Sequence, residues 1–222
     1  EAASTVGGKT ACILSGTYTS DISLTRDNSY LLDGKVLFGD EGMPMTLSIE
    51  SGVSIIGTSA DDFVVVSRGS QIQANGTAEM PILFTAIEEL QGSISSTSRG
   101  LWGGLVINGY APINDCPEGA TGGSADCTKE GEANSGLFGG DQPNDSSGTL
   151  RYVSVRYAGS NVDPENQLNG IAFQGVGDGT TVEYIQVHNN LDDGVEFFGG
   201  TVNAKYVALT GNSDDSLDWT DG

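Results

Sequence analysis

Basic side chains are scarce in this chain of 222 residues, where nine lysines and arginines face thirty aspartates and glutamates. The formal net charge of -21 repels phosphate backbones and anionic lipid surfaces, so nucleic acids and such membranes are excluded as partners. The same surface suits cations. Hydrophobic residues still make up 37% of the chain and alternate regularly, which excludes a disordered protein.

Long hydrophobic runs are also missing, since no segment reaches the roughly 20 apolar residues that a transmembrane helix needs. The chain shows no signal peptide and starts with EAASTVGG rather than with Met, as expected for a processed or trimmed start. Amphipathic helical periodicity is almost absent, and only Ala86–Gln91 (AIEELQ) is predicted to be a short helix. A helical fold is therefore excluded.

Cysteine and histidine are rare, with three and one copies. The single His188 and the lack of a Cys-x-x-Cys motif argue against a zinc site. Cys116 and Cys127 bracket the polar loop DCPEGATGGSADC, and we predict that a disulfide closes it. Such a bond favours an oxidising compartment, so we expect a protein that is secreted or on the outer cell surface. Cys12 is left over, either as a buried thiol or as the partner of a group outside this chain.

What the sequence does contain is short runs of Val, Ile, Leu, Thr and Tyr, cut by Gly, Asn and Asp. Examples are TLSIESGVSIIG at 46–57 and FVVVSRGSQIQANG at 63–76. These runs predict strands of about three to six residues joined by tight turns.

The predicted strands repeat. RYVSVRY, EYIQVHN and KYVALTG align with one another and place Tyr152, Tyr184 and Tyr206 at equivalent positions. Between them recurs a second strand, written NGIAFQG, DGVEFFG and DSLDWTD. Repeats of about 20–25 residues made only of strands and turns predict a solenoid. We therefore expect an all-β fold, a parallel β-helix whose coils stack roughly 4.8 Å apart.

The repeats also predict the organisation of a single domain over residues 1–222. Residues 1–45 read as an N-terminal cap and the first coils, and residues 150–222 as regular coils. Residues 114–147 break the rhythm as a long insertion rich in Gly and acidic residues. Loops of this length are usually functional or mobile.

Five segments, taken in order, carry a resemblance to a known family: SGTYTSDISLTRDNSYLLDGKVLFGDEGMPMTLSIESGVSIIG, SRGSQIQANGTAEMPILFTA, RGLWGGLVINGYAPIN, SSGTLRYVSVRYAG and SDDSLDWTDG. They resemble secreted or surface right-handed parallel β-helix proteins of marine and other Gram-negative bacteria, mostly known as hypothetical proteins or lipoproteins. The resemblance spans nearly the whole chain and implies a right-handed β-helix with an extracytoplasmic address, but no particular activity. Family members continue past the last motif, so we expect the C-terminal coil to be truncated or covered by another chain.

A set of three acidic residues occurs twice near the end of the chain. The motif NNLDDGVEFFGG at 189–200 is followed 22 residues later by GNSDDSLDWTDG at 211–222. Equivalent residues of successive coils stack, so these acids should form a surface ladder on one edge, with Glu196 and Asp218 pointing outward. The six residues of the ladder are Asp192, Asp193, Glu196, Asp214, Asp215 and Asp218.

Like charges stacked about 5 Å apart repel, so the ladder is costly unless something offsets the repulsion. A Ca²⁺ ion, which takes about six to eight oxygen ligands, would do so. The alternative is turn chemistry, in which the side chains of Asp192 and Asp214 bind turn amides. The sequence is compatible with both alternatives.

The insertion offers a second candidate cation site, which the glycines at 139 and 140 would help to wrap around an ion. Its residues are Glu130, Glu132, Asp141, Asn144 and Asp145. The alternative is a solvated loop.

An enzyme is the alternative to a binding protein, because β-helices include polygalacturonases and pectate lyases. The stretch NSDDSLD resembles the Asp-Asp motif of polygalacturonases, but their Gly-His-Gly and Arg-x-Lys motifs are missing. His188 aligns with Arg156 and Thr210 on an outward ladder, where a lone histidine is more often a surface residue than a base. A pectate-lyase mechanism would need an arginine beside Ca²⁺, and Arg156 is the candidate close to the repeats, although its more ordinary role is a surface ion pair with the excess acid. We therefore predict no catalytic residue.

The sequence as a whole predicts an extracellular structural or binding module that is calcium-stabilised and assembles end to end. The expected partner is another protein subunit, self or other, at the C-terminal coil, or an extracellular polysaccharide. The alternative is a carbohydrate-active enzyme of the lyase or hydrolase type that acts on such a polysaccharide.

Overall fold

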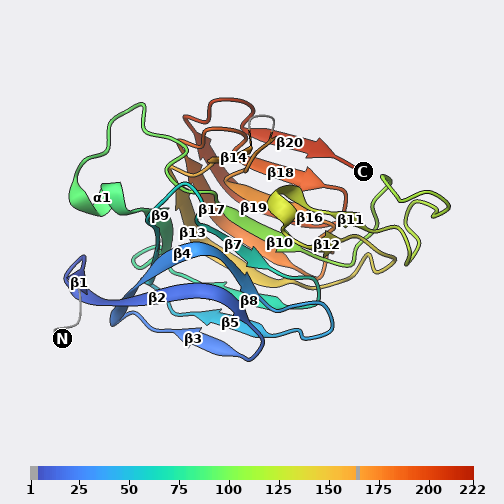
Figure 1. Ribbon diagram of the computed structural model, residues 1–222, viewed down its shortest axis with the longest axis horizontal. Helices are drawn as coiled ribbons and strands as arrows, with labels where there is room; N and C mark the ends of the chain where they lie inside the picture. Colours follow the sequence, from blue (N-terminus) through green and yellow to red (C-terminus); the bar gives the residue numbers. More distant parts are fainter. Residues whose placement is uncertain (1–4, 164–165) are drawn as a thin grey trace.

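The computed structural model describes residues 5–163 and 166–222, and it consists of short β-strands wound into successive coils (Figure 1). One 16-stranded sheet wraps around the molecule. Its ladders are parallel, apart from the pairing of β1 (Thr5–Val6) with β2 at the N-terminal end. The parallel β-helix expected from the repeats is therefore confirmed.

The longest strands turn a corner of the β-helix, so that the two halves of each belong to different faces. They are β2 (Lys9–Tyr18), β4 (Asn28–Phe38), β13 (Gly148–Arg156), β17 (Thr181–His188) and β19 (Asn203–Thr210).

The shorter strands complete three faces, along which each strand pairs with the equivalent strand of the next coil. The first face also contains β6 (Ser54–Gly57) and β9 (Ile82–Ala86). The third face also contains β3 (Ile22–Leu24), β5 (Thr46–Ile49) and β8 (Gln71–Asn75). The second face, which carries the candidate site, also contains β7 (Phe63–Val66), β10 (Leu105–Asn108), β16 (Ile171–Gln174), β18 (Val195–Phe198) and β20 (Leu217–Thr220).

The core consists of apolar residues stacked on the equivalent apolar residues of the neighbouring coils. Leu105 pairs with Ile171, which pairs with Val195, and all three side chains are buried. The rings of Phe173 and Phe197 stack at 5.3 Å in the same way. Burying each such side chain contributes about 1.5–3 kcal/mol, so the repeated apolar positions supply the main stabilisation.

The aligned tyrosines form a stack at the corner between the third and first faces. Tyr152, Tyr184 and Tyr206 have φ values of 49°, 55° and 58°, in the left-handed region that side chains other than glycine rarely adopt. Their rings stack at 4.5 and 4.3 Å, with Arg151 lying 5.8 and 5.6 Å from the first two rings. The contacts between neighbouring rings offset the strain of the bend.

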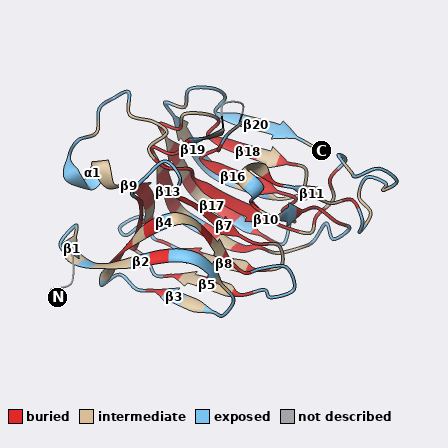
Figure 2. Ribbon diagram, viewed as in Figure 1, coloured by how far each residue is buried: buried red, intermediate tan, exposed pale blue. Residues whose placement is uncertain are grey.

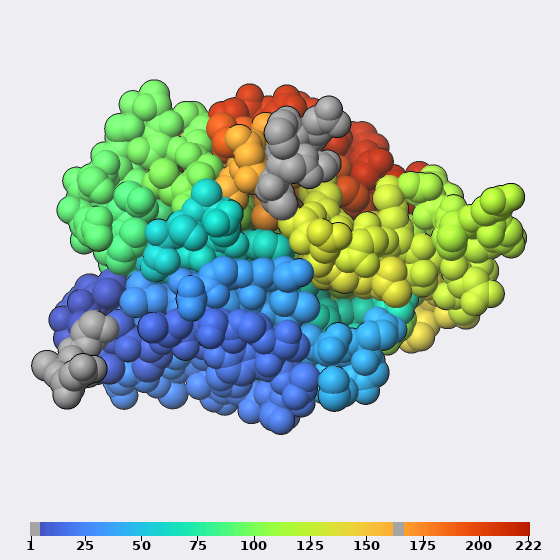
Figure 3. Space-filling view, in the orientation of Figure 1, coloured from blue at the N-terminus to red at the C-terminus, as the bar shows by residue number. Residues whose placement is uncertain are grey.

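The insertion lies between β10 and β13 and folds back over the second face. Its Cys116–Cys127 disulfide is present, as predicted. Strands β11 (Lys129–Glu130) and β12 (Leu137–Phe138) form an antiparallel pair, and the 3-10 turn Glu132–Asn134 joins them. We call residues 129–138 the insertion hairpin. Figure 3 shows the insertion, coloured yellow-green to yellow, as a lobe at the right of the molecule.

Outward-facing apolar residues of the second face make a smaller core with the insertion. Phe138 of the hairpin contacts Phe198 of β18 edge to face at 6.1 Å. Ile113, the disulfide-bonded Cys127 and Ala172 are buried in the same cluster. The insertion is thus packed on the β-helix.

The remaining elements lie outside the coils. The predicted helix is confirmed as α1 (Ile87–Gln91), between β9 and β10. Strands β14 (Asn161–Asp163) and β15 (Asn166–Gln167) form a small antiparallel pair. In the described part of the chain, no helix has the length and apolar character needed to span a bilayer.

The last coil is the most exposed one, as the pale colour of β20 shows in Figure 2. Leu217 and Trp219, although equivalent to buried core residues, are 46% and 72% exposed. The expected covering of this coil by another chain stays a prediction.

We expect the polypeptide 1–222 to self-associate through this coil, because exposed apolar side chains and open strand edges favour association. Analytical ultracentrifugation should show a mass that rises with concentration. The double change Leu217→Ser, Trp219→Ser should give a monomer, whereas Leu90→Ser, at an exposed position of α1, should not. A parent protein that stays monomeric at every concentration would contradict the prediction.

Candidate metal centre

Repeated asparagines fix the turns that carry the acidic ladder. Before β18, Asn190 donates its side-chain Nδ2 to the carbonyl oxygen of Asp193 at 2.6 Å. The Asn190 backbone N–H donates in turn to Oδ1 of Asn212, one coil further on, at 3.1 Å. The two turns are therefore bound to each other and present their acids at matching positions.

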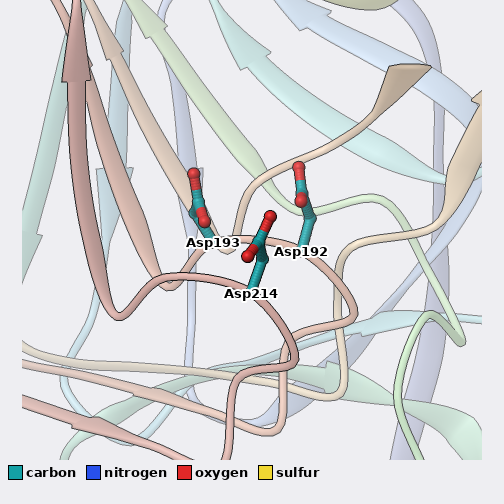
Figure 4. Close-up of side chains that lie close together, drawn as sticks. All are labelled: Asp192, Asp193 and Asp214. Atoms are coloured by element: carbon teal, nitrogen blue, oxygen red, sulfur yellow. The ribbon is translucent and has the colours of Figure 1, made fainter. Parts of the chain in front are cut away.

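Two overlapping groups of carboxylates result, and both contain Asp193. In each group, one oxygen from every residue lies within 4.8 Å of the others. Figure 4 shows the first group, with Asp214 lying close to Asp192 and Asp193 of the preceding turn. The groups are Asp192, Asp193 and Asp214, and Asp193, Glu196 and Asp218.

Asp215 belongs to neither group. Its backbone N–H donates to Oδ1 of Asp193 at 2.7 Å, so its contribution to the site is a main-chain donor. Turn chemistry is thus present, but it runs from one coil to the next through Asp193.

Strand register places Ala172, Glu196 and Asp218 in one outward row, as the alternation of side chains predicted. Glu196 is nevertheless only 8% exposed, so the expectation of an open surface ladder is wrong at this position. The reason is the insertion, which the alternation pattern does not describe. The insertion hairpin covers this part of the second face and brings Glu132 to it.

Asn169 joins the two glutamates. Its side chain is 1% exposed, and its Nδ2 donates to Oε2 of Glu196 at 2.6 Å. The same nitrogen lies 3.5 Å from Oε2 of Glu132. The Oδ1 atom of Asn169 is buried without a hydrogen-bond partner in residues 5–163 and 166–222. The hairpin thus adds a further carboxylate to the ladder.

Burial and mutual repulsion raise the pKa values of this cluster. Burial, followed by the charge of Glu132, raises the pKa of Glu196 to about 8, although the hydrogen bond from Asn169 works in the opposite direction. Burial, followed by the charges of Asp192 and Asp193, raises the pKa of Glu132 to about 7.

The aspartates of the first turn are affected in the same way. Burial is the main cause that raises the pKa of Asp193 to about 6, and it also raises the pKa of Asp192, to which the charge of Asp214 adds. A bound cation would remove the reason for these shifts, because it stabilises the charged form of every carboxylate around it.

The second predicted cluster is not brought together. Glu130 accepts a hydrogen bond from the backbone N–H of Gly136 at 2.7 Å, and Asp141 is exposed. Asn144 donates to Asp178 at 2.8 Å, whereas Asp145 accepts from the backbone N–H of Tyr110 at 2.9 Å. Glu132 alone joins the ladder, and sequence reasoning missed this pairing because no local pattern links the hairpin to β18.

His188 and Arg156 stack in register with Thr210 on the first face, away from the acidic ladder. Arg156 forms an ion pair with Glu89 of α1 at 2.8 Å, and Nδ1 of His188 hydrogen bonds to Oγ1 of Thr210 at 2.8 Å. The one arginine considered for a lyase reaction is therefore not beside the carboxylates.

Comparison with known proteins agrees with the fold. The family model described as a pectate-lyase-like β-helix domain matches residues 16–222. Neither a curated protein nor a solved structure matches the chain.

Without cations, we expect the protein to lose stability as the pH rises from about 5 to about 8. The raised pKa values mean that the folded state keeps protons between pH 4.5 and about 8 that the unfolded chain has released, so stability falls as pH rises. Melting temperatures in chelator across this range measure the effect.

The change Glu196→Gln should flatten the slope, whereas Glu79→Gln, at an exposed turn position, should leave it unchanged. A melting temperature that rises over the same range would show that the cluster does not carry this cost.

Proposed function

The chain belongs to the pectate-lyase-like β-helix domain family, and we propose that it is an extracellular binding module whose acidic ladder holds a calcium ion. The observation that carries this proposal is the position of Asp193, which two cross-coil carboxylate groups share. A single ion at this place would contact acids of both turns.

The donor set fits a hard cation. All side chains of the two groups offer carboxylate oxygens, and Ca²⁺ takes about six to eight oxygen ligands at roughly 2.3–2.6 Å. Asp193 and Glu196 are each 8% exposed, so their charges are costly without a counter-ion. Mg²⁺ suits the site less well, because it keeps its water and demands a stricter octahedron. The ligands would be Asp192, Asp193, Glu196, Asp214 and Asp218.

The role of such an ion is to join coils. β18 and β20 pair through backbone hydrogen bonds, while Glu196 and Asp218 repel each other directly across that pair. An ion between the carboxylates turns this repulsion into attraction and therefore stabilises the last coils.

The disulfide supports a location outside the cytoplasm, because such bonds persist in oxidising compartments. The sequence resemblance to surface proteins of Gram-negative bacteria agrees with it. As partners we propose a second protein subunit at the exposed last coil or an extracellular polysaccharide.

Addition of Ca²⁺ should raise the melting temperature by roughly 5–10 °C at a hundredfold excess over the dissociation constant, from about 2.7 kcal/mol of linkage and about 2–4 °C per kcal/mol. Chelator should reverse the change, and Mg²⁺ should produce a smaller one. Differential scanning calorimetry measures all three.

The double change Glu196→Gln, Asp218→Asn should stabilise the metal-free protein and abolish the calcium response. The matched control is Glu118→Gln, Asp141→Asn, which makes the same chemical changes at exposed insertion residues. Full retention of the response in the first variant would place the ion elsewhere. The absence of any response in the parent would reduce the ladder to turn chemistry.

A carbohydrate-active enzyme is the second candidate. It is favoured by the meeting of Glu132 and Glu196, which come from distant parts of the chain, at the Asn169 amide. Most glycoside hydrolases act through paired carboxyl groups. Arg156 lies on the first face, which favours hydrolysis over a lyase reaction.

A panel of extracellular polysaccharides distinguishes the candidates. A hydrolase should release reducing ends, and Glu196→Gln should abolish the release, while Glu79→Gln should not. Release that Glu196→Gln leaves intact would exclude this pair as the catalytic groups.

A further inference from the structure

We propose that Glu132 is a calcium ligand contributed by the insertion, so that the ion clamps the insertion hairpin onto the β-helix. The inference rests on the calcium site of the proposed function and adds to it a further ligand and a mechanical consequence. The base and the tip of the hairpin differ in how they are attached to the β-helix.

The base of the hairpin is held independently of the acidic ladder. Phe138 packs on Phe198, and Cys127 is buried and disulfide-bonded to Cys116. Lys129 forms ion pairs with Asp115 at 2.7 Å and with Asp221 at 3.0 Å. These contacts keep the hairpin over the second face whether or not a cation is bound.

The tip is attached mainly by polar contacts, and Ala133 adds a partly buried apolar contact with the smaller core. Lys35 donates to the carbonyl oxygen of Asn134 at 3.0 Å, and Nδ2 of Asn108 donates to that of Ser135 at 2.8 Å. Ala133 and Asn134 have φ values of 56° and 53°, so two consecutive residues other than glycine adopt the left-handed conformation. A strained turn with little apolar anchoring is the part of the hairpin that opens most easily.

The strained turn directs Glu132 toward the ladder. Its carboxylate and that of Glu196 share one donor, the Nδ2 of Asn169. A buried carboxylate and a half-buried one around one neutral amide repel each other, and this repulsion acts to lift the tip. A cation between them reverses the sign of that force.

Asn169 provides an independent indication that a ligand belongs here. The side chain is 1% exposed, and its Oδ1 has no hydrogen-bond partner in the part of the chain that the structure describes. A half-turn of the carboxamide exchanges Oδ1 and Nδ2, so that the oxygen faces the carboxylates. An amide oxygen is an ordinary calcium ligand, and this rotation would make Asn169 a ligand between the two glutamates.

Hydrogen exchange of the whole protein tests the clamp. Backbone amides of residues 131–136 should exchange about tenfold more slowly in CaCl₂ than in chelator, because a bound ligand stabilises the closed tip. Amides of α1, an exposed element outside the coils that opens locally, should not change. In the Glu132→Gln variant, the calcium-dependent slowing at the tip should disappear, whereas Glu118→Gln, in the same insertion, should behave like the parent.

Calorimetric titration with CaCl₂ provides a second measurement. Glu132→Gln should weaken binding about tenfold, as expected for the loss of one charged ligand, and Glu118→Gln should leave the affinity unchanged. Calcium that binds and raises the melting temperature without slowing exchange at the tip would overturn the clamp and leave the proposed function standing. A parent protein that binds no calcium at all would overturn both.

Discussion

In-register parallel pairing is the constraint on which the rest of this structure depends. Each residue of a coil lies directly over its equivalent in the previous coil, as Val195 does over Ile171 and under Leu217. At inward positions this arrangement is favourable, because apolar side chains stack into a continuous core. At outward positions the same register also stacks like charges, and it places Glu196 directly beside Asp218. The core and the acidic ladder therefore have the same cause. Wherever acidic residues repeat at outward positions, the register that builds the core also stacks their charges.

The insertion changes the character of that ladder. Water would screen part of the repulsion in a row of carboxylates on an open face, and the row would cost less than a covered one. Here the hairpin covers Glu196, adds Glu132 and leaves the neutral amide of Asn169 between them. The covered carboxylates then resist ionisation, as the raised pKa values of Glu132 and Glu196 show. The insertion thus converts a by-product of the repeat into a site where a cation gains much more than it would on an open surface.

The parts of the molecule that follow a period could be predicted from the sequence. The register of β16, β18 and β20, the stacked tyrosines and the outward direction of Glu196 all follow from alternation within strands and repetition between coils. The Cys116–Cys127 bond follows from a short polar loop between two cysteines. The meeting of Glu132 with Glu196 follows from neither rule. It depends on where a non-repeating hairpin packs. The contact between Phe138 of the hairpin and the outward-facing Phe198 fixes that position, and no local sequence pattern predicts this contact.

A β-helix with this register lengthens or shortens by complete coils. Removing one complete 22-residue period leaves the remaining residues over equivalent neighbours. Removing a single residue instead moves the inward side chains of a strand to the outer face. A change in the number of coils therefore leaves the stacking of the core intact. The candidate metal centre does not share this tolerance, because its carboxylates are divided between two adjacent coils and the insertion. Duplication of one coil lengthens the molecule but copies only a fraction of the centre, so the number of centres does not follow the number of coils.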